Sequence, residues 1–380
     1  MRNRPQGLQA QPHAAKSHRP GMADGDCGSM GLGLQTLGAV TQMDPALFAP
    51  LSAFLLSVGC LGCGIAVSSL LGSLKNITLV MIMAIVMGAV YCGLTIAGFI
   101  SLAAFSAGLA GILTAVVFSR LRKKQTTNRL TNQPEALPLK GALTAYGILI
   151  GLMVLTGLSA MVYPFLNQVS LAPVFPRVVS NQGFIVPAGP ILTFRPLIFS
   201  GTMIAIASLA GYLIFRMWRL LPGGSWRSIS RITWDAAIPT SIGILSMVGL
   251  STMMDHCGMT QLLAGGLSQA VGTAFPLLSP CVGMLGTFTT GNNSNSNVLL
   301  APLQKNVAGL LKIDPSLLIS GQTAGGSLGS MMAPAKIVVG CGTVGITGKD
   351  GLVLRRTLPY GIIIGLVVGL VTWLLVGVKF

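Results

Sequence analysis

The chain has 380 residues, of which 52% are hydrophobic and only 8% are charged, and its mean hydropathy is +0.76. A soluble domain usually carries about a quarter charged residues because its surface must stay hydrated. This composition therefore excludes an ordinary soluble protein and predicts that the chain lies in a lipid bilayer. The net charge is +16, and nine of the 24 basic residues lie on four short stretches between apolar runs or just after one. No basic face with interleaved aromatic residues, which nucleic-acid binding requires, is visible. No nucleic-acid partner is expected.

Residues 1–27 are polar and carry four basic side chains. They lack the apolar core that a cleavable signal peptide needs. We expect this segment to be disordered or non-native and to lie outside the folded protein.

Seven apolar runs approach the roughly 20 residues that a helix needs to cross a bilayer. They are residues 50–71, 77–96, 98–119, 143–163, 197–217, 236–254 and 359–378. The last run carries Gly361, Gly365 and Gly369 at four-residue spacing, which predicts a smooth strip for close helix packing. The expected fold class is an all-α polytopic membrane protein.

Basic residues are unevenly divided among the loops. Loop 120–142 holds six and loop 216–235 holds four, whereas the proline-rich loop 164–195 holds two. Two apolar runs, 143–163 and 197–217, separate the basic loops, so both basic loops can face the cytoplasm under the positive-inside rule. Loop 164–195 is then external.

This orientation predicts the outcome of cysteine labelling in intact cells. In a chain without its seven native cysteines, an impermeant maleimide should label a cysteine placed at Asn167 and spare one at Thr126. Labelling at Thr126 alone would show that the orientation is reversed.

Between residues 260 and 346 the apolar stretches become short and interrupted. The first interruption is the polar run Gly286-Thr-Phe-Thr-Thr-Gly-Asn-Asn-Ser-Asn-Ser-Asn297. Non-helical backbone at membrane depth must be buried in protein or line a watered cavity, and broken helices of this kind form the binding sites of secondary transporters. We therefore predict a re-entrant hairpin over 276–304. Its tip supplies the candidate substrate-binding residues Thr290, Gly291, Asn292, Asn293, Ser294, Asn295, Ser296 and Asn297.

The chemistry of this tip suits a small organic anion. Ser and Asn are strong helix N-caps, so residues 298–304 are expected to begin a half-helix whose positive end attracts a carboxylate. The amides can hydrogen-bond a substrate hydroxyl or coordinate Na⁺ through oxygen. The alternative is a polar loop that lies outside the membrane.

A second interruption is predicted to break a helix over 317–346. It offers the candidate binding residues Gln322, Thr323, Gly325 and Gly326, with glycines that permit close backbone approach. Lys336 lies among apolar neighbours, where a cation is costly and often functional. It is either the counter-ion of a monocarboxylate or a side chain that reaches back to the interface.

Other motif matches carry no function. Residues 340–345 fit the glycine pattern of a dinucleotide site, but no strand precedes them. His13, His18 and His256 are too far apart to form a metal site together, and no catalytic triad is assembled. No enzymatic activity, cofactor or metal is expected.

The two interrupted stretches resemble a known family. Ser279-Pro-Cys-Val-Gly-Met-Leu-Gly-Thr-Phe-Thr-Thr-Gly-Asn-Asn-Ser-Asn-Ser-Asn-Val-Leu-Leu-Ala-Pro-Leu-Gln304 resembles the signature of bacterial L-lactate permeases, and Gly325-Gly-Ser-Leu-Gly-Ser-Met-Met-Ala-Pro334 resembles the segment that follows it. The resemblance implies lactate and glycolate uptake driven by an ion gradient, commonly protons, in the bacterial inner (plasma) membrane. It also implies two inverted repeats, each with a re-entrant hairpin and a broken helix.

On this resemblance, residues 28–163 hold the remainder of an incomplete first repeat and the helices that follow it, and residues 196–380 hold the second repeat. The family's Glu-Gly-Ala-Ala-Gly-Phe-Gly motif is absent, so we expect that the family's N-terminal part is missing. Asn293 stands where members often carry Asp, and Ser330 stands where they carry Lys. The acidic residues after 236 are expected in loops, so the sequence does not decide whether the coupling ion is H⁺ or Na⁺. A homodimer is possible.

Overall fold

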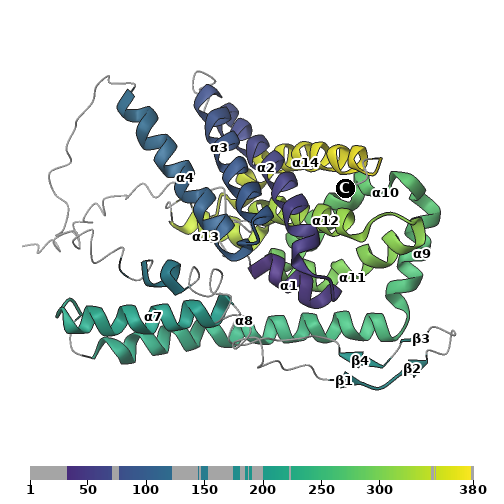
Figure 1. Ribbon diagram of the computed structural model, residues 1–380, viewed down its shortest axis with the longest axis horizontal. Coiled ribbons are helices and arrows are strands. Elements are labelled where there is room, and N and C mark those ends of the chain that lie inside the picture. The colour runs from purple at the N-terminus through teal and green to yellow at the C-terminus, as the bar shows by residue number, and fades with distance from the viewer. Residues whose placement is uncertain are drawn as a thin grey trace, which may run out of the picture.

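The computed structural model describes residues 32–70, 77–121, 144, 147–152, 174–179, 185–186, 188–190, 200–221, 224–343, 346 and 348–377. The N-terminal half contains α1 (Leu32–Thr41), α2 (Pro45–Leu70), α3 (Ile77–Ile96) and α4 (Ile100–Leu121). The C-terminal half contains α7 (Ser200–Met217), α8 (Ser225–His256), α9 (Met259–Val271), α10 (Phe275–Thr290), α11 (Asn293–Leu311), α12 (Pro315–Met332), α13 (Pro334–Thr343) and α14 (Asp350–Leu375), as Figure 1 shows.

The predicted all-α polytopic fold is confirmed. Among the described residues, five helical segments are long and apolar enough to cross a membrane. They are Pro45–Leu70, Ile77–Ile96, Leu102–Arg120, Met259–Thr290 and Asp350–Leu375. Helices α7 and α8 cover two further predicted runs, 197–217 and 236–254.

Several sequence predictions fall on residues that are described only in part. Residues 1–27 lie outside the described residues, and of the run 143–163 only 144 and 147–152 are described. The described part of loop 164–195 forms two antiparallel ladders. In these, β1 (Val174–Phe175) pairs with β4 (Gly189–Pro190), and β2 (Val178–Val179) pairs with β3 (Ile185–Val186). The division into two repeats stays a prediction.

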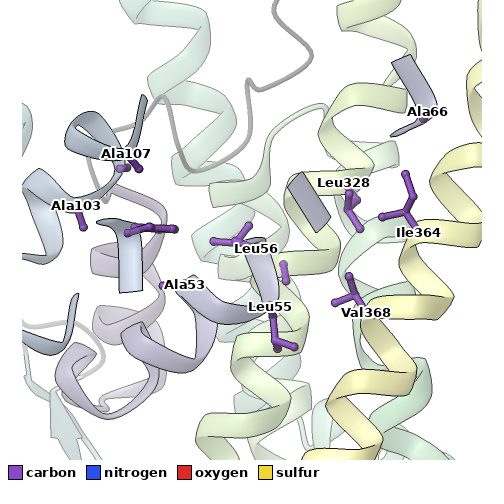
Figure 2. Close-up of a cluster of buried hydrophobic side chains, with 12 residues drawn as sticks. Ala53, Leu55, Leu56, Ala66, Ala103, Ala107, Leu328, Ile364 and Val368 are labelled. Carbon is purple, nitrogen blue, oxygen red and sulfur yellow. The ribbon is translucent and has the colours of Figure 1, made fainter. Parts of the chain in front are cut away.

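Helix α12 lies at the centre of the packing. It contacts α2, α10, α11 and α14, and 15 of its 18 residues are buried. Figure 2 shows Leu328 of α12 beside Leu55 and Leu56 of α2 and beside Ile364 and Val368 of α14, all within one buried cluster. Any polar side chain on the buried faces of α12 is therefore removed from both lipid and water.

Glycines bring the helices around α12 into backbone contact. A Cβ atom built on Gly325 would lie 1.8 Å from the Pro280 carbonyl oxygen of α10, and one on Gly369 of α14 would lie 2.1 Å from the Leu277 carbonyl oxygen. Gly361 and Gly365 similarly face Met332 and Met284. The predicted packing strip on the C-terminal helix therefore contacts α10 and α12.

Two details of the predicted hairpin and break differ from the structure. The predicted half-helix start at 298 is wrong, because α11 begins at Asn293 and the turn is confined to Gly291 and Asn292. The glycine-rich residues of α12 are helical, and the break falls at Ala333, where the backbone is extended before Pro334. Packing against α10 offsets the low helix propensity of glycine, which is about 1 kcal/mol per residue. Proline at 334 disfavours the α conformation at the residue before it.

Candidate functional site

The turn between α10 and α11 is held by its own polar residues. Gly291 ends α10 with φ of 77°, a conformation that glycine adopts without strain. The Asn292 side chain caps α11 by accepting a hydrogen bond from the Ser294 backbone N–H at 2.9 Å. Thr290 Oγ1 donates to the carbonyl oxygens of Gly286 and Asn292 at 2.8 and 3.1 Å. Thr290, Gly291 and Asn292 therefore shape the turn and aim the N-terminus of α11.

The central part of the site is a buried polar seam between α11 and α12. Asn293 Nδ2 donates to Thr323 Oγ1 at 3.3 Å and to Ser327 Oγ at 3.1 Å. One turn later, Asn297 Nδ2 donates to the same Thr323 Oγ1 at 3.0 Å. Asn297 and Thr323 are fully buried, and Asn293 is 5% exposed. The structure thus brings together residues of both predicted polar stretches, which are 26 to 30 positions apart.

A second line of hydrogen bonds extends the seam to α10. Gln304 Nε2 donates to Gln322 Oε1 at 3.1 Å and to the Ser279 carbonyl oxygen at 3.2 Å. Gln322 Nε2 then donates to Ser296 Oγ, which in turn donates to the Gly283 carbonyl oxygen. These polar groups fix α10, α11 and α12 against one another, because each buried partner would be left unsatisfied if the helices moved apart.

Glycines let the seam close. A Cβ built on Gly326 would lie 1.9 Å from Asn293 Oδ1, and one on Gly325 would meet the α10 backbone at Pro280. Gly325 and Gly326 are thus positioning residues: they permit the approach of Asn293 and of α10 to α12 and offer no side chain of their own.

Ser294, Asn295 and Lys336 lie apart from the seam. Asn295 is half a helical turn from both Asn293 and Asn297, so it lies on the opposite face of α11. Lys336 belongs to α13, beyond the break, and its Nζ donates to Ser330 Oγ. Ser330 lies about 10 Å along α12 from Thr323, at seven residues of 1.5 Å. A cation there also complements the negative end of α12, an interpretation that the sequence did not suggest.

Sequence reasoning missed several buried polar residues of this region. They are Ser52, Ser279, Thr287, Gln304 and Ser320, all fully buried. The available signal was helical spacing: Gln304 follows Asn297 by seven residues, which returns it to the same face of α11. Ser320, likewise, precedes Thr323 by one turn on α12.

The donors and acceptors of the seam are used unequally. The Nδ2 group of Asn297 is engaged by Thr323, whereas its buried Oδ1 has no hydrogen-bond partner among the described residues. Gln304 Oε1 and Thr287 Oγ1 are also buried without a hydrogen-bond partner among the described residues. The amide N–H groups of Asn293 and Asn297 already donate to side chains of α12. Asn297 Oδ1 is a buried acceptor one turn from the positive N-terminus of α11, and it suits a hydroxyl donor.

Comparison with known proteins agrees with the two sequence signatures. The sequence model of the L-lactate permease family matches residues 22–379. The L-lactate permease of Halalkalibacterium halodurans is 31% identical over 174 residues, which are 46% of this chain and 32% of that protein. The glycolate permease GlcA of Escherichia coli K12 is 30% identical over 189 residues, 50% of this chain and 33% of that protein. The L-lactate permease of Bacillus subtilis 168 is 30% identical over 213 residues, 56% of this chain and 35% of that protein.

Among solved structures, the Alcanivorax borkumensis YdaH transporter aligns with a TM-score of 0.44 at 17% identity, over 95% of this chain and 86% of that chain. The present chain spans about a third of the length of the curated permeases it matches. With its five candidate spans it is a multi-pass protein of the plasma membrane. The family's sequence model matches nearly every residue of the chain, and the chain therefore belongs to the L-lactate permease family.

Proposed function

We propose that this chain is a secondary carrier that imports L-lactate and related 2-hydroxy monocarboxylates such as glycolate. The observation that carries the proposal is Asn297: a fully buried amide whose donor is engaged by Thr323 and whose acceptor has no partner among the described residues. A 2-hydroxyl group can donate to that oxygen. The substrate carboxylate would then lie toward the N-terminus of α11, where free N–H groups and the helix dipole stabilise negative charge.

Transport is proposed to be coupled to an ion, with proton symport as the first expectation. A Na⁺-coupled carrier is the second, because buried oxygens such as Gln304 Oε1 are suitable Na⁺ ligands. A third reading, from another class, is a membrane remnant that packs against a partner and transports nothing.

Uptake of labelled L-lactate into proteoliposomes separates these readings. We expect accumulation when an inward proton gradient is imposed, and no further gain from a Na⁺ gradient at constant pH. Accumulation driven by Na⁺ alone would favour the second reading. The absence of uptake under either gradient, with correctly inserted protein, would overturn the carrier proposal.

A further inference from the structure

Asp255 is a half-buried carboxylate on the side of α11 away from the seam. The sequence placed it in a loop, but it lies in the last turn of α8, just after the apolar run 236–254. The other described acidic residues are exposed (Asp44, Asp235 and Asp314) or open a helix (Asp350). Asp255 is thus a carboxylate that neighbouring side chains partly shield from water.

Side chains from three helices face this carboxylate. Gln261 of α9 donates to Asp255 Oδ1 at 3.5 Å, and Asn306 of α11 also bonds the carboxylate. His256 and Lys305 are near enough to act on its charge. The carboxylate thus lies between two amides and two basic side chains contributed by α8, α9 and α11.

Lys305 links this cluster to the rest of the molecule. Its Nζ donates to the Thr41 carbonyl oxygen at the end of α1 at 2.6 Å. Lys305 and Asn306 lie on the same helix as Asn293 and Asn297 and directly follow Gln304 of the seam. A change of charge at Asp255 therefore acts on groups of the helix that also carries the candidate substrate site.

We propose that Asp255 is the proton-binding group that couples substrate import to the proton gradient; this inference rests on the proposed carrier function. The predicted loop 216–235 is shorter in the structure, because residues 225–235 already belong to α8. In the predicted orientation the start of α8 is cytoplasmic, so α8 brings Asp255 to the external side. A proton from that side forms an O–H bond with the carboxylate, and the same bond breaks when the proton is released inside. No electron is transferred.

The coupling follows from electrostatics. Protonation removes a negative charge near the path of an anion. Asp255 contacts Asn306, which lies nine residues, about 14 Å along the helix axis, from Asn297. At an effective dielectric constant of about 20, removal of a charge at about that distance changes anion affinity roughly several-fold. Linkage requires the reverse as well: bound anion must favour the protonated form of Asp255.

The test compares two transport modes in proteoliposomes that contain the full chain. Counterflow exchanges external for internal L-lactate and needs no net proton movement, whereas accumulation requires that the proton be bound and released. Asp255→Asn resembles the protonated carboxyl in shape and charge. We expect it to keep counterflow within about twofold and to lose proton-driven accumulation, so that the internal and external lactate concentrations become equal. The control Asp314→Asn removes an exposed carboxylate at the start of α12, and Asn can still cap that helix; it should keep both modes.

Each outcome decides one claim. If Asp255→Asn still accumulates lactate, the coupling role is wrong and the carrier function stands. If Asp255→Asn loses both modes, Asp255→Glu must restore both, because it returns a carboxylate; failure to do so would assign Asp255 to the fold and overturn the inference. If the wild-type chain shows neither mode, the carrier proposal itself fails.

Discussion

Replacement of Gly325 by alanine is expected to destabilise the folded protein strongly, although it adds only one methyl group. The new Cβ would lie 1.8 Å from the Pro280 carbonyl oxygen and 2.5 Å from the Pro280 Cα. These are backbone atoms, which cannot rotate away, so α10 and α12 must separate. Overpacking of a core costs about 1–3 kcal/mol, and we expect the upper end of that range, with a melting temperature lower by roughly 5–10 °C in detergent.

Gly309→Ala is the matched control, because nothing lies within 4 Å of a Cβ built at Gly309 of α11. Alanine there should leave stability unchanged or raise it by up to about 1 kcal/mol through helix propensity. Thermal unfolding followed by size-exclusion chromatography measures both variants. Equal melting temperatures for Gly325→Ala and the wild-type chain would show that α10 and α12 are not in backbone contact at this position.

The membrane-spanning helices could be predicted from the sequence because their signal is local. Long apolar runs with sparse charge identify α2, α3, α4 and α14 without any knowledge of their neighbours. The exact helix starts could not be predicted. Every Ser and Asn of the polar run 289–297 is a good N-cap, and only packing against α12 decides that Asn292 takes this position.

The errors around the candidate site share a physical cause. Glycine disfavours helix in isolation, so the stretch from 321 to 330 resembled a break. In the folded chain those glycines are what permits α12 to lie against α10. Likewise, the burial of Asp255 depends on α9 and α11, which no local pattern around residue 255 reveals. The candidate residues Asn293, Asn297, Gln322 and Thr323 were found because polar side chains in an apolar segment are conspicuous.

Substitution of Asn297 by alanine is expected to raise the half-saturating L-lactate concentration about tenfold. The change removes the buried Oδ1 acceptor and frees Thr323 Oγ1 from one of its donors. A lost hydrogen bond at a buried site costs about 1–2 kcal/mol, and about 1.4 kcal/mol corresponds to a factor of ten in affinity. Asn295→Ala is the matched control: it removes the same side chain two residues away, on the opposite face of α11.

The central claim is that the buried seam between α11 and α12 binds the substrate. The concentration dependence of L-lactate counterflow, measured side by side for the wild-type, Asn297→Ala and Asn295→Ala chains at equal protein density in proteoliposomes, tests it most directly. We expect half-saturation about tenfold higher for Asn297→Ala and within about twofold of wild type for Asn295→Ala. Wild-type half-saturation for Asn297→Ala, or a larger effect at Asn295 than at Asn297, would contradict the claim and place the substrate elsewhere.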